Sequence, residues 1–188
     1  MNDFQIEVRP LTYQEIDNFL QFMDGPAFET NPQWGECYCQ FYLNSAEDQT
    51  DQPGMGPINR QKACDRVANG TMHGYIAYVD GKPIGWVAAN KANNFKLLPP
   101  TDDDVARVLC FIVARDYQGR GVATALLEHA VSDLKEQGFR LIEAAPLASD
   151  EFQSWGYRGK LSTFKKAGFV EVAPLDDKHV LVQRQLTD

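Results

Sequence analysis

Apolar and polar residues alternate with a clear helical period in the second half of the chain. From Val122 to Leu134, apolar side chains recur at every fourth position, and the opposite positions carry polar and charged residues. This spacing places the apolar residues on one face of an α-helix, which must pack against the rest of the protein. Gly138 follows the last apolar position and is typical of a helix end. The pattern predicts an amphipathic helix over residues 121–137.

A continuous apolar run precedes this helix. Residues Val105–Val113 (VARVLCFIV) are nearly all apolar and rich in β-branched side chains, which is typical of a buried strand. Between the strand and the helix lies a segment with two glycines, residues 113–123 (VARDYQGRGVA). A strand, a glycine turn and a helix N-terminus in this order point several backbone N–H groups at one anion. The sequence therefore predicts a phosphate-binding turn at the carboxyl end of the strand.

Two common phosphate-binding motifs do not fit this turn. The dinucleotide fingerprint needs a third glycine three residues after the second, where this chain has Thr124. A P-loop needs the sequence Gly-Lys-Ser/Thr, which the chain does not contain. The pattern that remains is Gln-x-x-Gly-x-Ala, formed by Gln118, Gly121 and Ala123.

The other periodic segments predict strands and helices around this centre. Asp80-Gly81 joins two apolar runs and is a strong signal for a β-hairpin. Thr12 and Glu15 have the spacing of a capping box, which predicts a helix from Tyr13. The remaining expected elements are strands at 6–10, 140–145 and 179–185, a helix at 161–169 that ends at Gly168, and a strand from Phe169.

Length and composition are those of an ordinary globular domain. With 188 residues, 44% hydrophobic and 23% charged, the chain suits one domain over residues 1–188. No apolar run approaches the roughly 18 residues of a membrane span, and the N-terminus has no signal-like core, so a cytoplasmic location is expected. The net charge of −8, without a basic stripe, speaks against nucleic-acid and anionic-membrane partners.

The glycine turn and the order of elements resemble one enzyme family. Gln118, Gly121 and Ala123 are similar to the acetyl-coenzyme A signature Q/R-x-x-G-x-G/A of the GNAT N-acetyltransferase superfamily. The predicted order β-α-α-β-β-β-α-β-α-β-β, which covers most of the chain, is also similar to the order in that family. The resemblance implies an α/β (α+β) fold with a mixed, mostly antiparallel central sheet of about seven strands flanked by about four helices. It also implies an acyltransferase that takes acetyl-coenzyme A as co-substrate and needs no metal.

The same resemblance assigns residues to the cofactor. The diphosphate of acetyl-coenzyme A would lie on the amides of the glycine turn, with full charges added by Arg120 or Arg115. The pantetheine arm would run along the end of the preceding strand, where an amide would face the thioester oxygen. The cofactor-binding residues implied in this way are Phe111, Ile112, Val113, Gln118, Gly119, Arg120, Gly121, Val122 and Ala123.

Candidate catalytic residues flank this predicted cofactor site. Glu143, on the strand after the long helix, is the candidate general base, and the alternative for it is a solvated or salt-bridged carboxylate. Family members often carry a tyrosine acid four residues before the last helix-ending glycine, where this chain has Phe164, which cannot donate a proton. Tyr157 is one candidate substitute, for which the alternative is a ring at the edge of a loop. Ser162 and Thr163 are poorer substitutes, and Cys37 or Cys39 is a further alternative if that segment lines the acceptor side.

The choice of acceptor is expected to lie with two aromatic-rich segments. These are residues 28–42 (FETNPQWGECYCQFY) and 150–157 (DEFQSWGY), and they suit a small-molecule or peptide primary amine. The missing acid at Phe164 leaves open a second hypothesis, a non-catalytic acyl-coenzyme A sensor. A third hypothesis is a metal or redox protein based on Cys37 and Cys39, although C-x-C alone lacks the usual zinc spacing. Members of the family often pair, which leaves room for a homodimer.

Overall fold

One mixed β-sheet runs through the molecule. The computed structural model describes residues 4–149 and 157–187. Within these residues the sheet has seven strands in the order β1-β2-β3-β4-β5-β7-β6, and only the β4–β5 pair is parallel. The strands are β1 (Glu7–Pro10), β2 (Gly74–Val79), β3 (Lys82–Lys91), β4 (Val105–Val113), β5 (Leu141–Ala144), β6 (Val170–Pro174) and β7 (Val180–Gln185).

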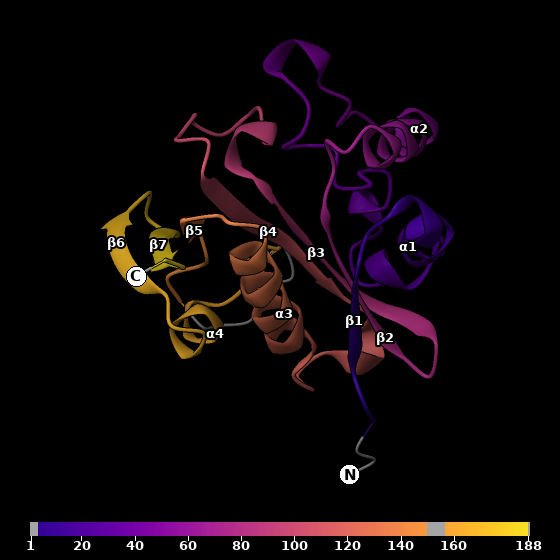
Figure 1. The fold of residues 1–188 in the computed structure, drawn as a ribbon. Helices are drawn as coiled ribbons and strands as arrows, with labels where there is room; N and C mark the ends of the chain where they lie inside the picture. The colour runs from indigo at the N-terminus through magenta and orange to yellow at the C-terminus, as the bar shows by residue number, and fades with distance from the viewer. Residues whose placement is uncertain (1–3, 150–156, 188) are drawn as a thin grey trace.

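Helices cover both faces of this sheet and create two hydrophobic cores (Figure 1). The described α-helices are α1 (Ile16–Asp24), α2 (Gly56–Ala68), α3 (Val122–Glu136) and α4 (Leu161–Lys166). α3 and α4 pack on one face, where the buried stripe of α3 meets residues of β2, β3 and β4. α1 and α2 pack on the other face, around the indole of Trp86. The predicted fold and the order of its elements are confirmed.

Several local predictions are also confirmed. α3 and β4 have the predicted extents, and Gly138 ends α3 with a φ of 90°. The hairpin of β2 and β3 turns at Asp80 and Gly81, whose φ angles of 49° and 75° are those of the tight turn that Asp-Gly favours. Gly168, with a φ of 82°, follows α4 as the sequence predicted.

The prediction of a capping box at the start of the first helix is wrong. Neither Thr12 nor Glu15 makes a side-chain cap, and the chain instead forms a 3-10 turn at Tyr13–Glu15 before α1 begins. The Glu15 carboxylate accepts hydrogen bonds from the hydroxyl of Tyr78 and from the amide of Asn18. The Glu15 carboxylate, which the local pattern assigned to the helix cap, therefore binds Tyr78 on β2, a residue that is distant in the sequence.

The sheet splits between β4 and β5, and this split positions the candidate site. β5 pairs only with the beginning of β4, from Val105 opposite Leu141 to Arg107 opposite Glu143. Beyond that point the register of β4 with β3 shifts, and Cys110 has a φ of 56° in a bulge. The last residues of β4 therefore have no neighbouring strand on the β5 side within the described chain.

The close approach of β2 to the indole of Trp86 gives a first testable prediction. A Cβ atom on Gly74 would overlap the Val87 carbonyl oxygen and the Trp86 ring. Because backbone and a fully buried indole must both move, we expect Gly74→Ala to lower the free energy of unfolding by about 3 kcal/mol in urea denaturation. Gly85→Ala is the matched control, since its Cβ would press mainly on a Val122 methyl group at 2.8 Å. A Gly74→Ala loss no larger than that of Gly85→Ala would contradict this packing.

Candidate active site

A cavity of about 560 Å³ lies in the split of the sheet. Its walls come from three places: the end of β4, the turn that leads into α3, and the segment that leads into α4. Ala27, Thr30 and Asn31, from the connection between α1 and α2, close it on the remaining side. A cavity of this size and position is typical of a site for a small organic ligand.

The turn into α3 presents an uncapped helix end to this cavity. Gly119 and Gly121 have φ angles of 72° and 86°, a left-handed conformation that side-chain-bearing residues rarely adopt. Gly121 is the N-cap of α3, no side chain caps it, and the first turn carries no acidic residue. The N–H groups of a first helical turn have no carbonyl partner in their own helix, so they are available to an anion.

The cavity gathers the predicted cofactor residues, with one exception. Arg120 does not line it, because its guanidinium lies over the ring of Phe4, 5.8 Å from the ring centroid. The cation among the described lining residues is Lys160, which no local sequence pattern pointed to. The predicted residues that do line the cavity are Phe111, Ile112, Val113, Gln118, Gly119, Gly121, Val122 and Ala123.

Two backbone groups at the end of β4 face away from β3 and are engaged within the protein. The Phe111 N–H donates to the Tyr157 carbonyl oxygen at 2.7 Å, and the Gln118 side-chain amide donates to the Val113 carbonyl at 3.1 Å. Ala114, the next residue, donates its N–H to Ile84 of β3. Alternation along the strand therefore turns the N–H groups of Phe111 and Val113 toward the split.

Tyr157 lies where the end of β4 meets the connection between α1 and α2. Its ring packs edge-on against Phe28 and Trp34, with centroid distances of 6.2 and 5.8 Å. Its hydroxyl is buried and has no hydrogen-bond partner in the described chain. Burial, with smaller contributions from nearby thiols, raises the pKa of Tyr157 to about 12, so the hydroxyl stays protonated at neutral pH.

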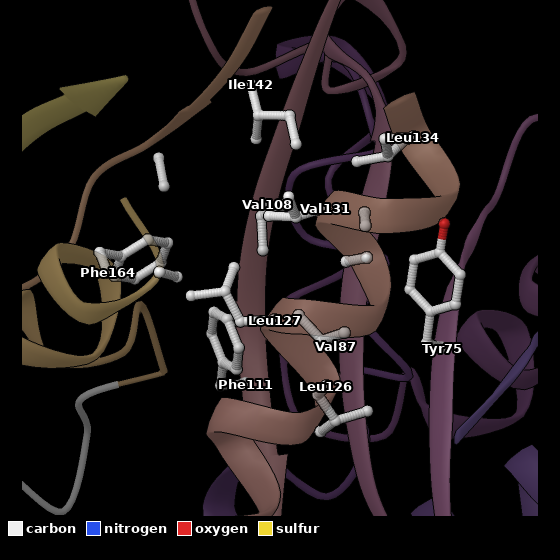
Figure 2. Packing of buried hydrophobic residues seen from close by; sticks show 14 of the residues in the cluster. Tyr75, Val87, Val108, Phe111, Leu126, Leu127, Val131, Leu134, Ile142 and Phe164 are labelled. Atoms are coloured by element: carbon white, nitrogen blue, oxygen red, sulfur yellow. The ribbon is translucent and has the colours of Figure 1, made fainter. Parts of the chain in front are cut away.

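Phe164 belongs to the hydrophobic core as well as to the cavity wall. It is fully buried, and its ring packs against Phe111 and Phe169 with centroid distances of 5.7 and 5.1 Å. Figure 2 shows Phe164 pointing from α4 toward the interface of β4 and α3, where Phe111 and Leu127 lie. Phe164 thus supports the cavity by packing and supplies no proton.

The structure places Glu143, the predicted general base, in a buried ion pair. Glu143 does not line the cavity, and its carboxylate pairs with the guanidinium of Arg107, which lies directly opposite on β4. Both residues are only 8% exposed, and Arg107 also donates to the Pro99 and Ala92 carbonyl oxygens. The alternative interpretation of a salt-bridged carboxylate is therefore the one that the geometry supports.

Cysteines from two distant segments converge beside Tyr157. Cys39 is buried in a tight turn, and its sulfur accepts a hydrogen bond from Trp86 Nε1 at 3.1 Å. Contact with the Cys110 thiol, together with burial, raises the pKa of Cys39, and burial raises that of Cys37. Within the described residues, no group of three or more His, Cys, Asp or Glu side chains is arranged to hold a metal ion. The sequence could not show that Cys110 joins this cluster.

The predicted acceptor segments meet the cavity only in part. Thr30, Asn31 and Tyr157 line it, whereas residues 150–156 lie outside the described chain.

No helix in the described ranges is both long and apolar enough to cross a lipid bilayer.

Comparison with known proteins identifies a protein family for this chain. The model of the acetyltransferase (GNAT) family matches residues 33–160, which is more than half of the chain and includes the glycine turn and the end of β4. The chain belongs to the GNAT family. The matching family model is that of an acetyltransferase family, and the relatives described next are named N-acetyltransferases.

Individual relatives agree with the GNAT assignment. An uncharacterised N-acetyltransferase of Methanocaldococcus jannaschii is 29% identical over 99 residues, which are 52% of this chain and 38% of that relative. An N-acetyltransferase from Staphylococcus aureus Mu50 has a TM-score of 0.61 at 14% identity, with 97% and 99% of the two chains covered. PaiA N-acetyltransferase from Thermoplasma acidophilum, solved with coenzyme A, has a TM-score of 0.59 at 16% identity, with 96% and 99% covered. At these identities the likeness to the solved GNAT structures concerns the fold.

Proposed function

We propose that this protein transfers the acetyl group of acetyl-coenzyme A directly to a primary amine of a small molecule or peptide. The observation that carries the proposal is one cavity with an uncapped helix N-terminus at one end and, at the other, the ring of Tyr157, which packs against Phe28 and Trp34. The first end suits the diphosphate, because the N–H groups of α3 favour an anion there, and Lys160 adds a positive charge to the lining of the same cavity. The second end suits the amine.

The end of β4 lies between these two ends and suits the pantetheine arm. The N–H of Val113 faces the split and lines the path from the glycine turn toward Tyr157. The N–H of Phe111 faces the same way, but it becomes available to a thioester oxygen only when the Tyr157 carbonyl releases it. A fixed N–H donor at this oxygen stabilises the negative charge that develops during acyl transfer.

The reaction itself needs little from the protein beyond placement. The neutral amine nitrogen attacks the thioester carbonyl carbon, the C–S bond breaks, the nitrogen loses a proton, and the sulfur leaves as a thiolate that takes up a proton. A thiol with a pKa of about 8.5 is a good leaving group, so an acid assists this step without being indispensable. The Tyr157 hydroxyl, protonated and without a partner in the described chain, is the candidate acid.

We expect Tyr157→Phe to lower kcat by about 10- to 100-fold while leaving the affinity for coenzyme A unchanged. Because the pKa of Tyr157 is raised to about 12, its proton is present at neutral pH and is lost only as the pH approaches that value. The wild-type rate should therefore show no decline below about pH 11. Steady-state kinetics with calorimetry tests this, and Tyr13→Phe, on an exposed ring, is the control. An unchanged kcat in Tyr157→Phe would remove Tyr157 from the mechanism.

The experiment that tests the proposed function separates binding from turnover. Calorimetry with coenzyme A measures binding, and release of free thiol from acetyl-coenzyme A with a panel of primary amines measures transfer. Binding followed by amine-dependent thiol release, with the acetylated amine found by mass spectrometry, is the expected result. Binding without thiol release from any amine would favour the sensor hypothesis, and no binding would defeat the proposal.

A further inference from the structure

A short segment before α4 spans the split of the sheet. On one side, the Tyr157 carbonyl oxygen accepts a hydrogen bond from the N–H of Phe111 on β4 at 2.7 Å. On the other side, the Gly159 carbonyl oxygen accepts one from the N–H of Leu147, which follows β5, at 3.2 Å. Residues 157–159, which we call the strap, are therefore hydrogen-bonded to both sides of the split.

The Gly159 end of the strap is packed against the cavity wall. A Cβ atom on Gly159 would lie 3.1 Å from the ring of Phe164 and 3.3 Å from the ring of Phe111. Gly159 has a φ of 80°, and a glycine in this conformation tolerates changes in φ and ψ that other residues do not. Gly159 can therefore act as a hinge while its Cα atom stays in place.

Arg158, in the middle of the strap, contacts a distant part of the chain. Its guanidinium donates a hydrogen bond to the Tyr42 hydroxyl at 2.8 Å and lies over the Tyr42 ring, 5.5 Å from the ring centroid. Both residues are half-buried, and a charge-assisted hydrogen bond is stronger in such surroundings than in water. Neither residue lines the cavity, so an effect of this pair on a ligand passes through the strap.

The Tyr157 carbonyl and the Arg158 N–H belong to one planar peptide group. This group rotates as a unit when the carbonyl turns away from the Phe111 N–H, so the backbone of Arg158 moves with it. The hydrogen bond on β4 and the position of the Arg158 side chain are thus mechanically linked.

We infer that Arg158 and Tyr42 are positioning residues that hold the Tyr157 carbonyl on the Phe111 N–H, so that the free protein closes its own thioester site. The inference rests on the proposed function, because it takes the Phe111 N–H as the donor to the thioester oxygen. Binding of acetyl-coenzyme A turns the carbonyl away and draws the guanidinium from Tyr42, and the two contacts open together. The affinity for acetyl-coenzyme A is therefore lower than that of a protein whose strap is already open.

Removing the Tyr42 hydroxyl tests this inference by binding. Tyr42→Phe keeps the ring beneath the guanidinium but removes the hydrogen-bond acceptor, so the strap should open more often. We expect the Kd for acetyl-coenzyme A, measured by calorimetry without an amine, to fall about fivefold, because a hydrogen bond to a charged group no longer opposes binding. Arg158→Met should have the same effect, and the double variant should add little to either single variant. Unchanged or weaker binding by Tyr42→Phe would overturn the inference.

Hydrogen exchange at Phe111 gives a readout that does not depend on activity. Cys110-Phe111 is the one Cys-Phe dipeptide in the sequence, so carbonyl-¹³C cysteine with amide-¹⁵N phenylalanine labels a single peptide bond for NMR. In the free protein, we expect the Phe111 N–H of Tyr42→Phe to exchange about fivefold faster than that of the wild type. Equal exchange rates would overturn the inference.

The Tyr157 carbonyl can be observed in the same way. Tyr157-Arg158 is the one Tyr-Arg dipeptide in the sequence, so carbonyl-¹³C tyrosine with amide-¹⁵N arginine labels that bond alone. We expect saturating acetyl-coenzyme A to shift the Tyr157 carbonyl resonance of the wild type, because the carbonyl loses its hydrogen bond to Phe111. Wild-type protein that binds no acetyl-coenzyme A would defeat the proposed function, whereas binding with an unshifted Tyr157 carbonyl would defeat this inference alone.

Tyr78→Phe is the matched control for Tyr42→Phe. The Tyr78 hydroxyl also donates to a charged residue, Glu15, and the guanidinium of Arg9 lies 4.5 Å from the centroid of its ring. Because Tyr78 does not line the cavity or contact the strap, Tyr78→Phe should leave the Kd and the Phe111 exchange rate within about twofold of the wild type. Equal acceleration of Phe111 exchange in both variants would indicate a general loss of stability and would overturn the inference.

Discussion

Replacing Gly121 with glutamate is expected to abolish measurable coenzyme A binding, which means a loss of affinity of more than about 100-fold. Gly121 is the N-cap of α3 and lines the cavity with a φ of 86°. A glutamate there would place a carboxylate against the N–H groups that we assign to the diphosphate, and it would repel that diphosphate. Space is not the obstacle, because a Cβ on Gly121 meets nothing within 4 Å. Calorimetry with coenzyme A measures the loss.

Two controls separate the charge from the backbone strain. Gly121→Ala introduces the strain of a left-handed residue, which costs about 1–2 kcal/mol of stability, without the charge. Gly138→Glu introduces both at the opposite end of the same helix, where φ is 90° and a Cβ also meets nothing within 4 Å. Both controls should bind coenzyme A nearly as the wild type does. Wild-type affinity in Gly121→Glu, or an equal loss in Gly138→Glu, would contradict the assignment of the diphosphate to this turn.

Removing the Glu143 carboxylate is expected to damage the fold and not the chemistry. Glu143→Ala leaves the guanidinium of Arg107 buried without its ion-pair partner, and such a loss typically costs about 3–5 kcal/mol. Urea denaturation should show this loss. The folded protein should keep its kcat/KM within about threefold, because Glu143 does not line the cavity.

A double variant sharpens this prediction. Arg107→Met combined with Glu143→Leu removes both charges, so it should recover part of the stability that Glu143→Ala loses. Recovery should be incomplete, because the Pro99 and Ala92 carbonyl oxygens lose the Arg107 donor. The contrary result would come from Glu143→Gln, if this variant kept its stability while its kcat/KM fell by about 100-fold. Loss of activity without loss of stability is expected only of a catalytic carboxylate.

The features that the sequence predicted well are those whose causes lie close together in the chain. The stripe of α3, the Asp80-Gly81 turn and the glycine turn each depend on a few successive residues, and the structure places them as predicted. The part of the cavity that we assign to the cofactor is local in the same sense, because most of it comes from residues 111–123. Hydrophobic period and glycine position were sufficient signals for this half.

The features that the sequence missed depend on which strands become neighbours. Glu15 bonds to Tyr78 on β2 instead of capping its helix, and Glu143 lies opposite Arg107 because β4 and β5 are parallel partners. An aromatic cluster joins Phe28 and Trp34 to Tyr157, across more than half of the chain. No periodic pattern specifies such a pairing, because in the sequence each partner is indistinguishable from an ordinary core or surface residue.

In the mechanism that we propose, the hydrogen bond from the Phe111 N–H to the Tyr157 carbonyl oxygen would set the order in which the two substrates bind. A thioester oxygen that accepts a hydrogen bond from the Phe111 N–H must displace the Tyr157 carbonyl oxygen. The Tyr157 ring also packs against Phe28 and Trp34. An amine that enters first would meet a pocket in which Tyr157 is still hydrogen-bonded to Phe111 of β4. Under the proposed function, acetyl-coenzyme A would therefore bind before the amine, which corresponds to a compulsory-order ternary mechanism with coenzyme A as the last product to dissociate.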